Sequence, residues 1–97
     1  MSLFNLSNKV VVITGASGQL GFEYVSLCIE SGAKVAALDL FKSPKFKIFS
    51  EDKFQFYEVD ILSKTSLSKT LERIKQTLGD PSVLINNAGL DSPPSST

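Results

Sequence analysis

A run of mostly β-branched aliphatic residues, Lys9–Thr14, leads directly into Gly15, Gly18 and Gly21. Because the run is continuous and does not alternate with polar residues, it predicts a strand buried on both faces, as in a parallel sheet. Three glycines directly after such a strand predict a sharp strand-to-helix turn whose backbone can approach another group closely. An α/β fold is therefore expected to begin here.

The following segments continue the alternation of strands and helices. Residues 19–31 place apolar side chains near helical spacing, and Gly32 follows where a left-handed C-terminal cap is expected. Residues 34–40 (KVAALDL) predict a second strand, which completes a βαβ unit. Residues 54–59 (FQFYEV) predict a third strand, whereas residues 41–53 are interpreted as either helix or loop.

A second helix has the clearest pattern, because Ser63 can cap it and Gly79 and Pro81 can end it. Its apolar side chains recur along one face, at Leu67, Leu71, Ile74 and Leu78. Residues 82–85 predict a fourth strand. The alternation predicts a doubly wound α/β sheet of four parallel strands in the order 3-2-1-4. We expect one domain over residues 1–90 and a loop or disordered tail over residues 91–97.

Composition excludes several classes of site. The 97 residues contain no histidine, so they hold no Ser/His/Asp triad and no imidazole proton shuttle, and the single cysteine excludes an internal disulfide. No metal site is expected. Ten basic and ten acidic residues give a net charge of zero, which predicts no partner among nucleic acids or membranes. The N-terminus has no signal-peptide pattern, so a cytoplasmic location is expected.

The three glycines suit the binding of a phosphate group. Free N–H groups and the positive end of the helix dipole stabilise an anion at such a turn. The spacing is G-x-x-G-x-x-G, and no G-K-[ST] sequence follows, which excludes a nucleoside-triphosphate P-loop. The alternative is a glycine-rich turn that binds no ligand.

Asp39 strengthens the dinucleotide hypothesis. It lies 18 residues after Gly21, at the end of the second predicted strand, where a carboxylate can accept hydrogen bonds from a ribose diol. The same charge repels a 2′-phosphate by about 4 kcal/mol at ~4 Å and an effective dielectric constant of about 20, so NAD is favoured over NADP. Lys42 can offset part of this repulsion. The alternative is a solvated acid without a ligand.

Together, the segment TGASGQLG, Asp39, Asp60 and the segment NNAG at residues 86–89 resemble the N-terminal, cofactor-binding half of a short-chain dehydrogenase/reductase. The resemblance implies a Rossmann-type fold and an NAD(P)-dependent oxidoreductase acting on a small carbonyl or alcohol. It implies that the pyrophosphate contacts Gly15, Ser17, Gly18, Leu20 and Gly21. Asp39 would bind the adenosine ribose, and Asp60 with Ile61 would flank the adenine. The sheet and the nicotinamide-side ribose would be supported by Asn86, Ala88 and Gly89.

Two features depart from the family pattern. Gln19 stands where classical members have glycine, which favours the extended subfamily and its nucleotide-sugar epimerases and dehydratases, whereas NNAG is typical of classical members. The family's catalytic Tyr-x-x-x-Lys lies beyond the fourth strand, and neither Tyr24 nor Tyr57 has a lysine four residues on. We therefore expect no catalytic residue here and interpret the chain as a fragment that is inactive alone. The alternative is a non-catalytic NAD(P)-binding sensor or scaffold.

Such a half domain would also have unprotected surfaces. The fourth strand would form a free sheet edge, and one sheet face would lack its helices. We expect the chain to be weakly folded or to form homo-oligomers.

Overall fold

The computed structural model describes residues 5–87. The strands are β1 (Val10–Thr14), β2 (Lys34–Asp39), β3 (Phe54–Glu58) and β4 (Val83–Asn86), and the helices are α1 (Gln19–Glu30), the short 3₁₀ helix η1 (Pro44–Ile48) and α2 (Lys64–Thr77). The four strands form one parallel sheet in the order β3-β2-β1-β4. This confirms the predicted Rossmann-type α/β fold, its four parallel strands and their order.

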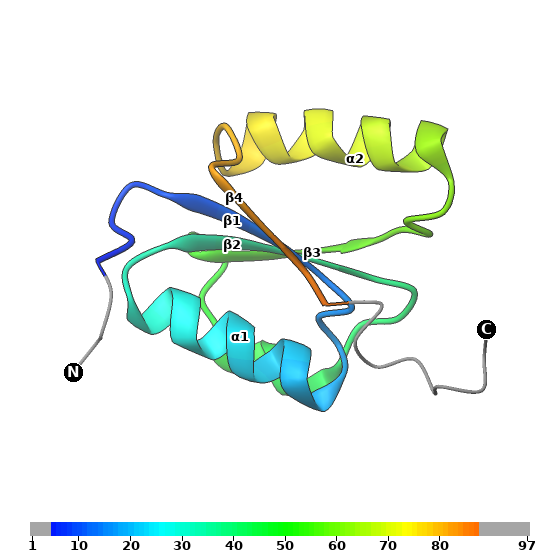
Figure 1. Cartoon of the computed structure of the whole chain (residues 1–97). Helices are drawn as coiled ribbons and strands as arrows, with labels where there is room; N and C mark the ends of the chain where they lie inside the picture. The colour runs from blue at the N-terminus through cyan, green and yellow to red at the C-terminus, as the bar shows by residue number, and fades with distance from the viewer. Residues whose placement is uncertain (1–4, 88–97) are drawn as a thin grey trace.

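One helix packs on each face of the sheet, with α1 on one side and α2 on the other (Figure 1). The expectation that one face would lack its helices is therefore wrong. The reason is the strand order, because the chain moves outward from β1 to β3 and then returns across the sheet to β4. Right-handed crossovers in opposite directions place their helices on opposite faces.

The two central strands are the most buried elements, since every residue of β1 is buried. On the α1 side, Val11 and Ile13 share a buried cluster with Val25. On the α2 side, Val12 shares a second cluster with Ile74. The continuous aliphatic run thus forms a strand with a hydrophobic core on each face.

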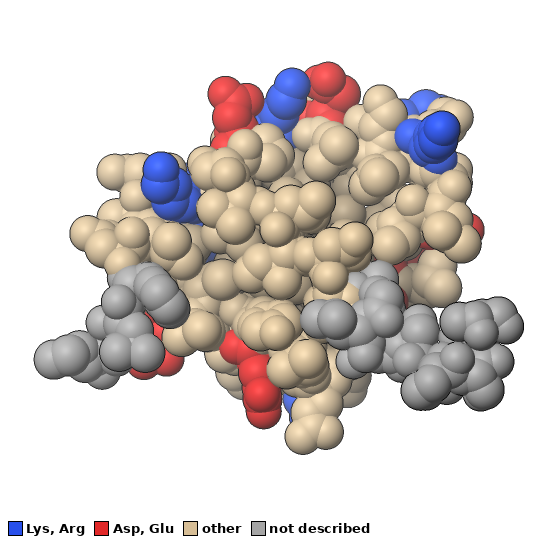
Figure 2. Space-filling view, in the orientation of Figure 1, with Lys and Arg blue, Asp and Glu red and all other residues tan. Residues whose placement is uncertain are grey.

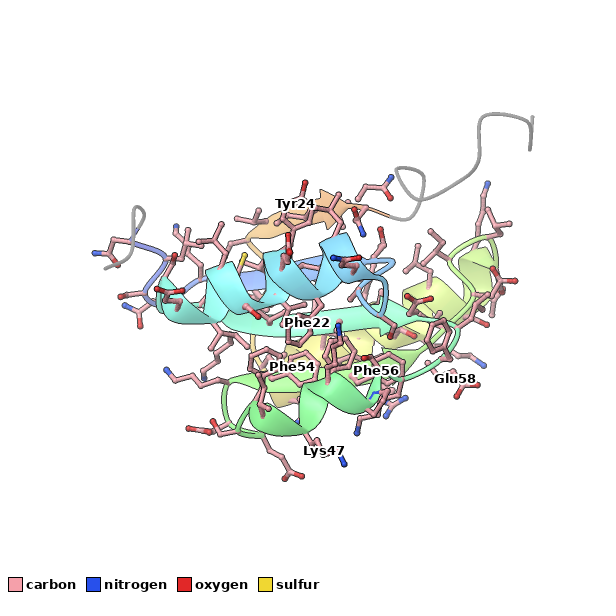
Figure 3. The ribbon with its side chains drawn as sticks, turned by 90° about the horizontal axis from the view of Figure 1, so that it is seen from below. Phe22, Tyr24, Lys47, Phe54, Phe56 and Glu58 are labelled. Carbon is pink, nitrogen blue, oxygen red and sulfur yellow. The ribbon has the colours of Figure 1, made fainter. Side chains whose placement is uncertain are left out.

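The segment interpreted as either helix or loop, residues 41–53, contains η1 and contributes Phe46 and Phe49 to an aromatic cluster. Ser43 caps η1 by accepting a hydrogen bond from the backbone N–H of Lys45. Phe46 is 1% exposed, and its ring lies 4.8 Å from that of Phe54 between centroids. The cluster comprises Phe22, Phe46, Phe49, Phe54 and Phe56. Figure 3 shows Phe22 on α1 facing Phe54 and Phe56, with Lys47 directed outward.

The predicted ends of both α-helices agree with the structure. Ser63 caps α2 by accepting a hydrogen bond from the N–H of Ser66, and Gly79 follows α2 with a φ of +119°. Gly32 follows α1 with a φ of +101°. The strand β4 is the least buried, with Leu84 65% exposed.

Candidate functional site

The carboxyl ends of β1 and β4 form the topological switch point of the sheet, where α/β proteins place their ligands. The turn after β1 begins at Gly15, whose φ is +64°. A Cβ atom on Gly21 would lie 2.3 Å from the carbonyl oxygen of Gly15. Glycine at position 21 therefore lets the first turn of α1 pack directly against the backbone of the preceding turn.

The N-terminus of α1 presents a positive dipole end without a side-chain cap. Gly18 is the N-cap residue, and the first turn contains no acidic residue. The N–H groups at a helix start have no intrahelical acceptor, so they suit an anion. Leu20, in this first turn, is 37% exposed and thus lies at the surface.

Asp39, at the end of β2, is joined to the glycine turn. Its Oδ2 accepts a hydrogen bond of 2.9 Å from the backbone N–H of Ser17, and its Oδ1 accepts one of 2.7 Å from the N–H of Leu40. Each carboxylate oxygen retains capacity for a second donor. A carboxylate with unused acceptor capacity thus lies beside the glycine turn.

The side chain of Ser17 connects the same turn to the loop after β2. Its Oγ donates a hydrogen bond to the carbonyl oxygen of Phe41 and accepts one of 3.2 Å from the N–H of Ser43. The sequence predicted Ser17 as a pyrophosphate contact and gave no sign of this second role, because the loop conformation depends on tertiary packing.

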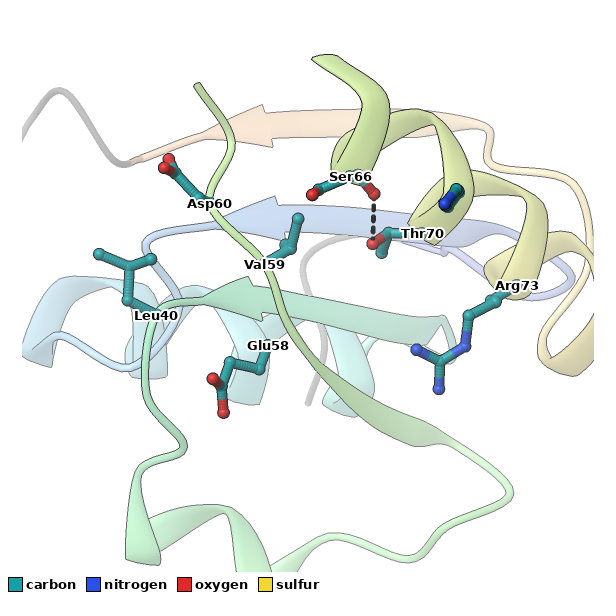
Figure 4. Close-up of a pocket in the computed structure, with 8 residues that line it drawn as sticks. Leu40, Glu58, Val59, Asp60, Ser66, Thr70 and Arg73 are labelled. Carbon is teal, nitrogen blue, oxygen red and sulfur yellow. Dashed lines mark hydrogen bonds between the residues drawn. The ribbon is translucent and has the colours of Figure 1, made fainter. Parts of the chain in front are cut away.

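A pocket of about 460 Å³ lies at the ends of β2 and β3 beside α2 (Figure 4). It is lined by Leu40, Glu58, Val59, Asp60, Ser66, Lys69, Thr70 and Arg73. Asp60 is one of these lining residues and accepts a hydrogen bond of 3.0 Å from the N–H of Leu62. The side chain of Ile61 packs against the hydrophobic cluster on the α2 side. The two predicted adenine contacts therefore face different surroundings.

Two asparagines, one at the end of β4 and one directly after it, join this strand to β1. Asn86 Oδ1 accepts a hydrogen bond of 2.9 Å from the hydroxyl of Thr14. Asn87 is fully buried, and its Nδ2 donates a bond of 3.1 Å to the carbonyl oxygen of Gly15. Sequence reasoning omitted Thr14 and Asn87, although each is adjacent to a predicted site residue. The predicted residues Ala88 and Gly89 lie outside the described part of the chain.

Burial raises the pKa of the Cys28 thiol, which is 5% exposed and belongs to the core on the α1 side. A buried thiol with a raised pKa is unreactive and acts as a small apolar side chain. Within residues 5–87, no group of three or more His, Cys, Asp or Glu side chains is arranged to hold a metal ion. The same residues include no helix with the length and apolar character needed to span a membrane.

Comparison with known proteins identifies the family. A family model described as short chain dehydrogenase matches residues 9–97. The chain is 36% identical over 84 residues to the dehydrogenase RED2 of Cochliobolus heterostrophus, a match that covers 87% of this chain and 31% of the relative. It is 31% identical to a 3-beta-hydroxysteroid dehydrogenase of Comamonas testosteroni, covering 88% of this chain and 34% of that protein. The chain belongs to the short-chain dehydrogenase family.

Solved structures of this family share the fold. A short-chain dehydrogenase/reductase from Brucella melitensis superposes with a TM-score of 0.77 at 25% identity, covering 87% of this chain and 37% of that one. A short-chain dehydrogenase from Leptospira borgpetersenii with bound NAD⁺ superposes with a TM-score of 0.70 at 26% identity, covering 84% and 32%. The chain thus spans about a third of the length of the relatives it matches.

Proposed function

We propose that this chain is the NAD-binding part of an oxidoreductase that acts on a small carbonyl or alcohol. The observation that carries the proposal is the Asp39 carboxylate, joined to the backbone of Ser17 in a glycine turn that leads into an uncapped helix. These residues fit a dinucleotide, because the helix start suits its phosphates and the carboxylate suits a ribose diol. When bound, the nicotinamide supplies or accepts the hydride.

In this proposal, different residues at the carboxyl ends of the strands hold different parts of the dinucleotide. The pyrophosphate lies at the first turn of α1, where its contacts are Gly15, Ser17, Gly18, Leu20 and Gly21. Asp39 holds the adenosine ribose. Asp60, with Ile61, flanks the adenine beside the pocket, and the support of the nicotinamide-side ribose falls to Asn86, Ala88 and Gly89. The hydrogen bond from Thr14 to Asn86 supports this last role by fixing β4 against β1.

NAD is the proposed cofactor in preference to NADP. Asp39 carries a negative charge where a 2′-phosphate would add about two more, and close like charges repel strongly in a partly desolvated site. Lys42 lies in the loop that follows and offsets part of this repulsion.

The proton donor of the reaction is proposed to lie outside residues 5–87. Tyr57 is 3% exposed on the α2 side, where its hydroxyl hydrogen-bonds to Thr77 and the Arg73 guanidinium lies 5.3 Å from its ring centroid. Tyr24 packs against the core on the α1 side. Since neither tyrosine is followed four residues on by a lysine, the 97-residue chain alone is proposed to bind the cofactor without turning over substrate.

Two alternative functions would use the same residues. A non-catalytic dinucleotide sensor would keep the whole site, and an epimerase or dehydratase of nucleotide sugars is favoured by Gln19 in the glycine turn. NAD-dependent oxidation of an alcohol by the full-length protein would exclude the sensor. Binding of a nucleoside-diphosphate sugar would favour the epimerase.

Calorimetric titration of the 97-residue chain with NAD⁺ and with NADP⁺ tests the proposal. We expect saturable binding of NAD⁺ that weakens at least about tenfold in Asp39→Ala, because two ribose hydroxyl groups lose a charged acceptor. Asp52→Ala is the matched control, since Asp52 precedes β3 at the amino ends of the strands, away from the proposed site. Its carboxylate accepts a local hydrogen bond from the Ser50 hydroxyl. A folded chain that binds neither dinucleotide would contradict the proposal.

A further inference from the structure

Ser17 is the one residue in the glycine turn whose side chain reaches the loop after β2. Its backbone N–H donates a hydrogen bond to the Asp39 carboxylate. Its hydroxyl donates one to the carbonyl oxygen of Phe41 and accepts one from the N–H of Ser43. Three hydrogen bonds from a single residue thus join the phosphate-binding turn to the loop that follows the ribose-binding carboxylate. Lys42 lies between the two held positions.

The far end of this loop is fixed independently. Ser43 is 6% exposed, and its hydroxyl caps η1 through the N–H of Lys45. Phe46 in η1 is anchored in the aromatic cluster, which includes Phe22 of α1. The loop therefore has an anchor at η1, and the Ser17 hydroxyl couples its residues Phe41 and Ser43 to the glycine turn.

We propose that the Ser17 hydroxyl is a latch that sets the preference of this site for a 2′-hydroxyl over a 2′-phosphate on the adenosine ribose. This inference rests on the proposed function. In it, Ser17 is a positioning residue: it keeps the loop closed beside Asp39 and thereby holds the backbone of Lys42 in place.

The physical argument concerns what a 2′-phosphate needs. It brings a charge of about −2 and three acceptor oxygens next to a carboxylate, so it is accepted only where the loop moves and a cation approaches. With the latch closed, the backbone on both sides of Lys42 is held and this adjustment is prevented. Without the Ser17 hydrogen bonds the loop is flexible, and binding either dinucleotide must order it at a cost in conformational entropy. Only a 2′-phosphate offsets this entropy cost, because it can form an ion pair with Lys42.

The experiment measures Kd for NAD⁺ and NADP⁺ in wild type, Ser17→Ala, Ser17→Thr and the control Ser68→Ala, a change at an exposed position on α2. Ser17→Ala is expected to weaken NAD⁺ binding about tenfold and to leave NADP⁺ binding within about twofold, which corresponds to the loss of one or two neutral hydrogen bonds. Ser17→Thr keeps the hydroxyl and is expected to restore the wild-type ratio.

A second readout needs no cofactor. The N–H of Ser43 donates to Ser17 Oγ, so its hydrogen exchange is expected to accelerate about tenfold in Ser17→Ala and to be unchanged in Ser68→Ala. If Ser17→Ala does not fold, Ser17→Cys, with a weaker acceptor of similar size, is compared with Ser17→Thr in both measurements.

Equal weakening of NAD⁺ and NADP⁺ would overturn the inference, because it would assign the hydroxyl to the pyrophosphate that both share. Unchanged exchange at Ser43 would overturn it as well. A folded wild type that binds neither dinucleotide would overturn the proposed function and this inference with it. The exchange data would then show separately whether the latch itself exists.

Discussion

Gly21 is the residue at which packing leaves the least freedom. An added Cβ would lie 2.3 Å from the Gly15 carbonyl oxygen and 2.7 Å from the Cα of Ala16, both of which are backbone atoms. Because neither atom can rotate away, a methyl group must push α1 from the turn. The same movement would displace the helix start from any bound phosphate.

Gly21→Ala is therefore expected to lower the free energy of unfolding by about 2 kcal/mol or more, as in other overpacked sites. Urea unfolding followed by circular dichroism measures this change. Ser26→Ala on the same helix is the control and should stay within about 0.5 kcal/mol of wild type. A Gly21→Ala protein as stable as wild type would show that the turn is not tightly packed.

Cys28 supplies a pH-dependent prediction. Because burial raises the pKa of this thiol above its ordinary value of 9.0, the unfolded chain loses the proton first as pH rises. The contribution of Cys28 to stability is thus present below pH 9.0 and is lost as pH increases through the raised pKa. Cys28→Ala should show a smaller fall in unfolding free energy above pH 9. An identical fall in both proteins would contradict the burial of the thiol.

Sequence reasoning could place Asp39 in the fold because its position depends on one residue in a motif, whereas its role in binding stays a prediction. Asp39 follows a strand and a glycine turn at the expected spacing, and the structure places its carboxylate beside that turn. The role of the Ser17 hydroxyl and the burial of Asn87 depend on segments 24 and 72 residues away, respectively. No local pattern encodes such contacts.

At the scale of elements, the N-terminus of α2 can be predicted from local sequence alone. The sequence predicts Ser63 as its cap, and the Oγ of Ser63 accepts a hydrogen bond of 3.3 Å from the N–H of Ser66. Capping is local, so sequence alone sufficed. In contrast, η1 depends on the packing of Phe46 in a cluster with side chains of α1 and β3, so the local sequence pattern does not determine its conformation.

Ser63→Ala is expected to destabilise the protein by about 1 kcal/mol, because the first turn of α2 loses its side-chain acceptor. The midpoint of urea unfolding measures the change. Ser68→Ala, within the same helix and exposed, should be neutral or slightly stabilising, since alanine has the higher helix propensity. Equal effects of the two substitutions would argue against capping.

At the scale of the molecule, the sheet is covered by a helix on each face, yet β4 remains open at its edge. Val83 and Leu84 are 38% and 65% exposed. The central part of the face that β4 crosses shows no charged side chain in Figure 2. An uncharged free edge favours pairing with another chain.

The 97-residue chain is therefore expected to self-associate, and Leu84→Lys should reduce the association by placing a charge on this edge. Sedimentation velocity at several concentrations measures the change. Ile48→Lys is the control, because Ile48 is 71% exposed but lies on η1. A monomeric wild type with one cooperative unfolding transition at high temperature would contradict the prediction.

The central claim is that the glycine turn and Asp39 form a dinucleotide site. Its most direct test is titration of the ¹⁵N-labelled chain with NAD⁺, followed by amide chemical shifts. We predict saturable changes in the amide shifts of Ser17, Leu20 and Asp39. Little change is expected at Gly32 and Gly79, which precede β2 and β4 at the amino ends of the strands. Unchanged shifts at the glycine turn of a folded chain, or changes confined to the amino ends of the strands, would contradict the claim.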